Sequence, residues 1–335
     1  MGTIYITKDD TFIGKIDERI HVKSDRKQIL DVPFIKVDGL VILGRSNFSP
    51  ALVAELLERK IPMSFLTTTG KYLGRLEPEL TKNIFIRKAQ WKTEDNSEKA
   101  LHIVKGFIRG KLKNYRNFLQ LRNRQNNHEK LEISINQIQD IIDGLERKNN
   151  VHSLRGLEGA GSAIYFSCFN LLIKNNEFSF NTRNRRPPTD PVNSLLSLGY
   201  ALLRHDIQSA VNIVGFDPYL GYLHVAHYGR PALALDLMEE FRPIVTDAVV
   251  LNVINNKKIT PKDFITEPLS NAVSLTKEGL QIFLRAYEEK KQSKFKHPVL
   301  NRQCTYQESF EIQARFLAKY LMDETKQYPP LIIKK

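Results

Sequence analysis

The 335-residue chain has few cysteines, a single tryptophan and no apolar run near the roughly 18–20 residues that span a bilayer. Its two cysteines, Cys168 and Cys304, are too few for a disulfide framework or a zinc ribbon, and they suit a reducing cytoplasm. The first residues lack the charged and apolar segments of a secretory signal. We therefore expect a cytoplasmic protein that does not act with a membrane, and its length favours two domains.

Acidic side chains are scarce in one segment. The whole chain has 50 Lys and Arg against 37 Asp and Glu, a formal charge of +13. Residues 82–124 contain twelve basic and three acidic side chains, whereas residues 1–80 are nearly neutral, with twelve and eleven. Such a concentration of positive charge is typical of a surface that binds nucleic acid. A solvated, lysine-rich helix is the other interpretation of the charge alone.

The periodicity of the basic segment predicts a long helix over residues 97–126. Apolar residues recur there in steps of three and four, which indicates one buried face. This face consists of Leu101, Val104, Ile108, Leu112, Tyr115 and Leu119. A basic stripe, displaced by about 100° around the helix, consists of Lys105, Arg109, Lys113 and Arg116. We expect this basic stripe to contact successive phosphates of a nucleic-acid strand in a salt-sensitive way, without base specificity.

The first 80 residues predict a small β-sheet domain. Short runs rich in β-branched and aromatic residues alternate with Asp and Gly, and one of these predicted strands covers Val32–Val37. Ser49 and Pro50 mark the start of the only helix expected in this part.

The remainder of the chain predicts helices. Apolar residues recur at helical spacing, and Asp190-Pro191 and Pro231 mark helix starts. The sequence therefore predicts an α+β protein: a small N-terminal β-sheet domain followed by a mostly α-helical domain. The expected boundaries are 1–80 for the β domain, 81–96 for a linker and 97–335 for the helical domain.

A glutamate lies within a glycine-rich run, Gly156-Leu157-Glu158-Gly159-Ala160-Gly161. A carboxylate on a buried helix is unfavourable without a partner, although an exposed Glu near a helix start is the simpler interpretation. The run matches neither GxGxxG nor a Walker sequence, which excludes a nucleotide-binding fold of those types. One side of this helix carries small residues, so we expect a neighbouring element to approach it closely there. These residues are Gly156, Gly159, Ala160 and Ala163.

Two further segments contain polar residues in apolar surroundings. Asp217–His224 reads DPYLGYLH and delivers an imidazole after an aromatic turn, which on its own is typical of a core histidine. Asp236, Glu239 and Glu240 follow Pro231 at positions i, i+3 and i+4, so they are predicted on one side of a helix. Mutual repulsion of these carboxylates can be relieved by a divalent cation. Solvent exposure, or pairing with Arg230 and Arg242, is the alternative.

Taken together, these segments resemble the CRISPR-associated spacer-acquisition endonuclease/integrase family, the universal adaptation integrase of CRISPR systems. The resemblance rests on the glutamate in its glycine-rich helix, the DPYLGYLH turn and the run GRPALALDLMEEFRP from Gly229 to Pro243. The run RPPTDPVNSLLSLGY from Arg186 to Tyr200 is similar to a fourth segment of the family. Length and motif order agree along the whole chain.

The resemblance implies a metal site formed by Glu158, His224 and Glu239, with Asp236 behind it or as an occasional ligand. It also places His227 and Arg230 in a turn where phosphate contact is expected. Other motif positions, to which we assign no chemical role from the sequence, are Tyr165, Asn193 and Tyr200. Nitrogen and carboxylate ligands without thiols suit Mg²⁺ or Mn²⁺, and the imidazole favours Mn²⁺.

The family resemblance further implies an activity and partners. Members are metal-dependent DNA endonucleases and integrases, in which a 3′-hydroxyl attacks a phosphodiester to insert spacer DNA into the CRISPR repeat array. They act on double-stranded DNA, dimerise, and bind a small ferredoxin-like CRISPR adaptation protein. Two other functions are compatible with the residues: a non-catalytic nucleic-acid scaffold with a structural acidic cluster, and an RNA-binding factor that uses the 97–126 helix.

Overall fold

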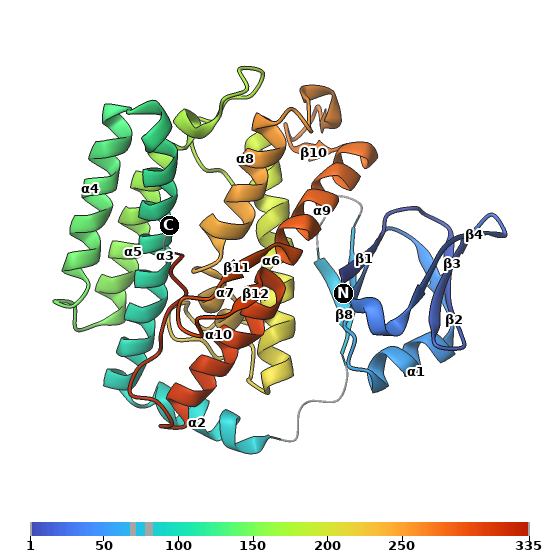
Figure 1. The fold of residues 1–335 in the computed structure, drawn as a ribbon, viewed down its shortest axis with the longest axis horizontal. Helices are drawn as coiled ribbons and strands as arrows, with labels where there is room; N and C mark the ends of the chain where they lie inside the picture. Colours follow the sequence, from blue (N-terminus) through green and yellow to red (C-terminus); the bar gives the residue numbers. More distant parts are fainter. Residues whose placement is uncertain (1, 68–71, 78–82, 334–335) are drawn as a thin grey trace.

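The computed structural model describes residues 2–67, 72–77 and 83–333, and it has the predicted α+β architecture. Two four-stranded sheets form the N-terminal part, and helices form nearly all of the rest (Figure 1). One sheet has the order β1-β5-β7-β8 and the other has the order β4-β3-β2-β6. Their strands are β1 (Gly2–Ile6), β2 (Thr11–Ile16), β3 (Arg19–Ser24), β4 (Lys27–Pro33), β5 (Val37–Leu43), β6 (Ser46–Phe48), β7 (Met63–Leu66) and β8 (Tyr72–Leu76).

The sheet that contains β5 is buried on both faces. Leu40 and Ile42 pack into a small core shared with the second sheet and with helix α1 (Pro50–Glu58). Val41 and Leu43, which alternate with them along the strand, belong to the large core of the helical region. Pairing of β1 with β5 and of β5 with β7 is parallel, as is common where both faces of a sheet are covered.

The helical region is built around one long helix. Its helices are α2 (Ile84–Glu94), α3 (Ser97–Asn126), α4 (Glu129–Gly144), α5 (Val151–Ser167), α6 (Pro191–Val214), α7 (Ala232–Met238), α8 (Ala248–Asn255), α9 (Lys277–Gln292) and α10 (Tyr306–Leu321). A π-helical turn, η3 (Arg242–Asp247), joins α7 to α8. Helix α3 packs against α4 and α5 on one side and against α7 and η3 on another, so it is a central element (Figure 1). The remaining strands form two hairpins, β9 (Phe264–Thr266) with β10 (Val273–Leu275) and β11 (Lys294–Lys296) with β12 (Gln303–Thr305).

Several local predictions can be compared with these elements. Ser49 caps α1 by accepting from the Leu52 amide, and Asp190 caps α6 by accepting from the Asn193 amide. The predicted strand over Val32–Val37 is wrong, because a 3₁₀ turn at Phe34–Lys36 separates β4 from β5. Pro33 cannot donate to a strand ladder, which favours the end of β4 at that residue.

The predicted linker over 81–96 contains helix α2. Gln90 on this helix is buried, donates to the carbonyls of Asp217 and Leu220, and accepts from the Asp217 amide. Helix α2 is therefore an ordered part of the helical region and supports the turn that precedes His224. The domain boundaries at residues 80 and 96 otherwise remain a prediction.

Both cysteines, Cys168 and Cys304, are buried free thiols. None of the helices within the described ranges combines the length and apolar composition needed to cross a membrane.

Buried polar contacts join the β domain to the helical region. The hydroxyl of Ser64 on β7 lies 2.8 Å from Nε2 of His205 on α6. Lys291 on α9 is fully buried, pairs with Asp206 and Glu288, and donates to the Thr3 hydroxyl on β1. Such satisfied polar groups fix the orientation of the sheet on the helices more specifically than apolar packing alone.

Stability is expected to fall as the pH drops below about 6.5, in part because of His205. Burial, reinforced by Arg75, Lys291 and Arg204, lowers the pKa of His205 to about 3. The unfolded chain therefore binds a proton below about pH 6.5 that the folded protein excludes, which costs up to about 1.4 kcal/mol per pH unit. The difference in unfolding free energy between the wild type and His205→Gln, measured by urea denaturation from pH 7 to 5, should shrink with falling pH. A constant difference would contradict this assignment.

Candidate active site

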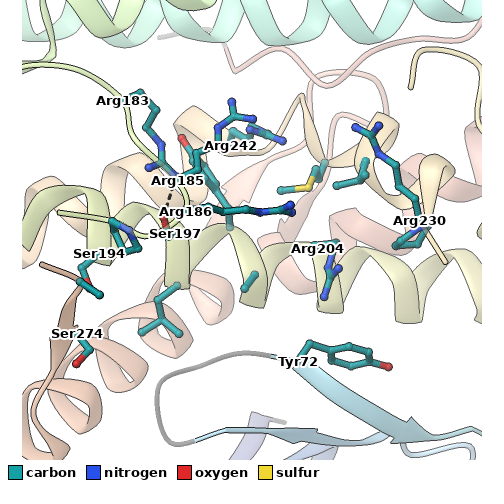
Figure 2. A pocket seen from close by; sticks show the side chains of 18 of the residues that line it. Tyr72, Arg183, Arg185, Arg186, Ser194, Ser197, Arg204, Arg230, Arg242 and Ser274 are labelled. Carbon is teal, nitrogen blue, oxygen red and sulfur yellow. Dashed lines mark hydrogen bonds between the residues drawn. The ribbon is translucent and has the colours of Figure 1, made fainter. Parts of the chain in front are cut away.

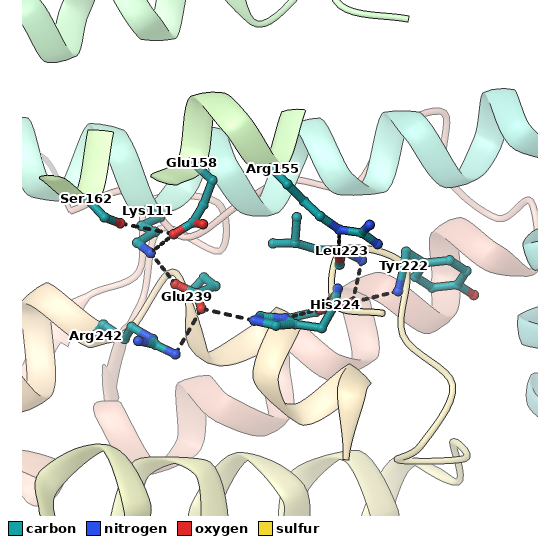
Figure 3. A network of polar contacts seen from close by, with 10 residues as sticks. Lys111, Arg155, Glu158, Ser162, Tyr222, Leu223, His224, Glu239 and Arg242 are labelled. Atoms are coloured by element: carbon teal, nitrogen blue, oxygen red, sulfur yellow. Dashed lines mark hydrogen bonds and ion pairs between the residues drawn. The ribbon is translucent and has the colours of Figure 1, made fainter. Parts of the chain in front are cut away.

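The structure brings Glu158, His224 and Glu239 together from three separate segments. Glu158 lies on α5, His224 in the turn before α7, and Glu239 at the residue that caps α7. Nε2 of His224 is 3.9 Å from Oε1 of Glu239. The ammonium of Lys111, from α3, contacts both Glu158 and Glu239, and it lies 2.6 Å from Oε2 of Glu239 (Figure 3). A cation thus already lies between the two carboxylates.

The three side chains do not form a finished coordination sphere. Among the described residues, no group of three or more His, Cys, Asp or Glu side chains is placed to hold a metal ion as it stands. The donor set still suits a hard or borderline divalent ion, because it offers carboxylate oxygens and one imidazole nitrogen. The interposed ammonium indicates that positive charge is stabilised at this position.

Asp236 orients the imidazole. Its carboxylate is fully buried and accepts from the backbone amides of Tyr222, Leu223 and His224, at 2.6, 2.9 and 2.9 Å. Oδ1 of Asp236 also lies 2.7 Å from Nδ1 of His224. A carboxylate that accepts a hydrogen bond from Nδ1 directs Nε2 toward Glu239 and makes Nε2 a better metal ligand. A side chain at Gly221 would meet Asp236 Oδ2 at 2.7 Å, so this turn depends on glycine.

Two cations compensate the buried charge of Glu239. The side chain of Glu239 is 3% exposed, with Arg242 Nη2 3.0 Å from Oε1 and Lys111 beside Oε2. Burial alone would raise the pKa of this carboxyl, but Arg242 and Lys111 hold it at about 2. Glu239 is therefore ionised at neutral pH, as a metal ligand must be.

Glu240 does not share the surroundings of its neighbours. It accepts from the Tyr328 hydroxyl, the Leu331 amide and the Gln313 side chain, and burial raises its pKa to about 8. The prediction that Asp236, Glu239 and Glu240 lie on one side of a helix is wrong, because α7 ends at Met238. The three carboxylates contact three different sets of partners, and Glu240 anchors the C-terminal segment.

Aromatic residues behind the acidic cluster support Arg242. The Arg242 guanidinium lies 4.7 Å from the centre of the Tyr200 ring, and the Tyr200 hydroxyl donates to Asp247 at 2.6 Å. The Tyr165 hydroxyl donates to the second oxygen of Asp247, and the Tyr165 ring stacks on Tyr115. Tyr165 and Tyr200, which had no role assigned from the sequence, thus hold the π-helical turn that carries Arg242.

A large basic cavity adjoins His224 and Arg242. It has a volume of about 1390 Å³ and lies between α6, the turn before α7 and the β domain at Tyr72 (Figure 2). We call it the arginine cavity because its lining includes six arginines: Arg183, Arg185, Arg186, Arg204, Arg230 and Arg242. His227 and Tyr228 also line it. One wall is ordered by Asn193, whose side chain accepts from Arg183 Nη1 at 2.7 Å.

Most of the arginines that line the arginine cavity were not predicted from the sequence. Arg230 was predicted to contact DNA and does line it, whereas Arg204 and the Arg183–Arg186 run were overlooked. Three arginines among the four residues before Pro187 could have indicated a phosphate-binding segment. Arg204 was not detectable, because it is the only lysine or arginine of α6 and lies two residues from Asp206.

The basic stripe on α3 is more buried than predicted. Lys105 and Arg109 pair with Glu146, with side chains 14% and 26% exposed, and Lys113 and Arg116 are half-buried. The helix predicted over residues 97–126 is α3, and its predicted apolar face is buried except at Leu101, which is half-buried. Other sides of α3 are enclosed as well.

The packing of α5 also differs from expectation. Gly156 and Gly159 face open space, and the close approach occurs instead at Gly161, where a Cβ would lie 2.4 Å from Leu112 of α3. This contact brings α5, and with it Glu158, within reach of Lys111.

Comparison with known proteins identifies the class to which this fold and site belong. A model of the family described as "CRISPR associated protein Cas1" matches residues 4–289. A CRISPR-associated endonuclease of Thermus thermophilus is 37% identical over all of this chain and 98% of its own length. A second, from Chlorobaculum tepidum, is 32% identical over 99% of this chain and 98% of its own length. The chain is thus a CRISPR-associated endonuclease.

Solved structures share the fold. A casposase bound to integration product superposes with a TM-score of 0.86 at 23% identity, over 100% of this chain and 95% of that one. The CAS1 protein TM1797 of Thermotoga maritima gives 0.80 at 24% identity, over 96% and 97% of the two chains. The chain belongs to the Cas1 family, which confirms the resemblance inferred from its motifs.

Proposed function

We propose that the protein inserts short double-stranded DNA, the spacer precursors, into the CRISPR repeat by metal-dependent strand transfer. The observation that carries this proposal is that Glu158 and Glu239 flank one cation position beside the arginine cavity, with His224 next to Glu239. Arginines suit phosphate recognition because their planar guanidinium forms paired hydrogen bonds to phosphate oxygens. The casposase with the same fold is described with an integration product, which supports strand transfer as the reaction.

Glu158, His224 and Glu239 would hold Mg²⁺ or Mn²⁺, with Asp236 fixing the imidazole from behind. When bound, such an ion supplies Lewis-acid polarisation of a phosphodiester and lowers the pKa of an attacking hydroxyl. The chain's own residues do the positioning: the arginine cavity binds the DNA end, and Arg242 contributes positive charge next to Glu239. Attack by a DNA 3′-hydroxyl gives strand transfer, and attack by water gives hydrolysis.

We further propose that the protein works as a homodimer with a small ferredoxin-like CRISPR adaptation protein. Large apolar side chains are exposed on the β domain, including Ile35 at 72%, Ile29 at 50% and Phe12 at 48%. We expect these side chains to belong to the dimer interface, because contiguous exposed apolar surface is typical of protein interfaces. A solved Cas6-RT-Cas1–Cas2 complex shares this fold with a TM-score of 0.84, although the chain spans only 36% of that polypeptide.

A strand-transfer assay on branched DNA tests the proposed function. We expect joined and released strands with Mn²⁺ or Mg²⁺, loss of both products with EDTA, and recovery when metal is added back. A nucleic-acid scaffold with a structural acidic cluster would bind the same DNA and give no metal-dependent product. Preference for RNA over duplex DNA in competition would favour the RNA-binding interpretation.

A further inference from the structure

We propose that Lys111 is an internal counter-ion that competes with the divalent cation for Glu158 and Glu239, so that metal binding displaces its ammonium. The inference rests on the proposed function, because it takes these two carboxylates as metal ligands. It assigns to Lys111, which lies on α3 outside the motif segments, a role in setting the affinity of the site for metal.

The contacts of Lys111 place its charge between the two carboxylates. Its Nζ contacts Oε1 of Glu158 and lies 2.6 Å from Oε2 of Glu239, and its side chain is 3% exposed (Figure 3). The close approach at Gly161 brings the backbones of α3 and α5 together one turn from Glu158. A lysine ammonium is a compact point charge, so it can substitute for a small metal ion between two carboxylates.

Arg242 is less suited to this role, although it also pairs with Glu239. Of the two carboxylates, it pairs with Glu239 and not with Glu158, and its guanidinium lies over the Tyr200 ring. Lys111 bridges both carboxylates and has a flexible four-carbon stem, which allows the ammonium to leave without moving the helix. Its Nζ already lies 5.5 Å from the centre of the Tyr115 ring, where a cation is also favoured.

The charge balance argues for displacement. Glu158 and Glu239 carry two negative charges, and Lys111 and Arg242 carry two positive ones, so this cluster is neutral. A divalent ion added beside both cations would leave a net positive charge in a buried place, where like charges repel strongly. The repulsion is reduced if the ammonium of Lys111 leaves. Lys111 should therefore stabilise the protein without metal and weaken its affinity for metal.

Calorimetric titration of the full-length protein with Mn²⁺ alone tests this inference. We expect Lys111→Met to bind Mn²⁺ at least ~5-fold more tightly than the wild type, within the usual range of coupling between sites. In EDTA the same variant should melt about 5 °C or more below the wild type, because the buried Glu239 and the partly buried Glu158 both lose a partner. Lys99→Met is the matched control: Lys99 lies on the same helix and pairs with Asp323, so its loss should leave Mn²⁺ affinity unchanged.

Unchanged or weaker Mn²⁺ binding by Lys111→Met would overturn the inference. Lys111→Gln, which keeps a donor without the charge, should also bind Mn²⁺ more tightly, and failure of both variants to fold even with Mn²⁺ would count against it. In the wild type, amine labelling of Lys111 followed by mass spectrometry should be faster in Mn²⁺ than in EDTA, and equal labelling would also overturn it. If Glu239→Gln binds Mn²⁺ as well as the wild type, the proposed metal site itself is wrong.

Discussion

Glu239→Gln is expected to reduce strand transfer by about 1,000-fold, while the protein stays folded and still binds DNA. A metal ligand contributes several kcal/mol to the transition state, and about 4 kcal/mol corresponds to this factor. Glutamine is preferable to alanine because it fills the same volume and can accept a hydrogen bond from Arg242 or Lys111. Alanine would leave Arg242 buried without a carboxylate and Lys111 with Glu158 alone, at a cost of about 3–5 kcal/mol of stability. The readout is the branched-DNA assay with Mn²⁺.

Glu240→Gln is the matched control for this prediction. Glu240 is the next residue and is equally buried, but its carboxylate contacts Gln313, Tyr328 and Leu331. We expect this variant to lose stability and to keep most of its strand transfer. Glu158→Ala and His224→Ala should lose strand transfer as Glu239→Gln does. Metal-dependent activity retained in all three site variants would contradict the assignment, and so would equal losses in Glu239→Gln and Glu240→Gln.

Removing two arginines from the arginine cavity should weaken binding of DNA with a single-stranded 3′ end by about 100-fold at low salt. We choose Arg183→Ala with Arg204→Ala, because the two side chains line the cavity from different segments and neither contacts Glu239. A hydrogen bond to a charged group contributes about 1.5–3 kcal/mol, so two lost contacts correspond to this factor or more. The dependence of affinity on salt should also fall by about 0.7 per lost phosphate contact.

Two comparison variants separate the arginine cavity from general charge. Arg315→Ala removes an exposed cation of α10 that pairs with Glu311, and it should leave affinity and salt dependence nearly unchanged. Lys113→Ala with Arg116→Ala tests the predicted basic stripe on α3 in the same titration. If this pair reduces affinity as much as the cavity pair, the main DNA contact lies on α3 and not in the cavity.

The sequence was sufficient for the fold class and for naming Glu158, His224 and Glu239, which come from three separate segments. Asp190 and Ser49 act as caps because capping depends on local chemistry, which a sequence displays directly. The triad could be named because each member lies in a recognisable segment. What could not be predicted is the direction of each side chain: Glu240 points toward the C-terminal segment, since α7 ends two residues before it.

Charge was the least predictable feature of the site. Lys111 belongs to the same basic helix as the stripe, but nothing in its spacing distinguishes a lysine buried between carboxylates from one that faces solvent. The arginine cavity is lined by residues spread between Tyr72 and Leu280, so no single stretch of sequence contains it. Both depend on which elements pack together, and a count of charges along the chain does not contain that information.

The burial of helix α6 limits which substitutions this protein can tolerate. Of its 24 residues, 15 are buried, and among the rest Ile213 is the one that faces solvent freely. One side of the helix meets the β domain through His205, and another presents Arg204 and Tyr200 to the arginine cavity. In a library of single substitutions, α6 should therefore be the least permissive of the long helices, whereas α4, with one face in solvent, should accept many replacements.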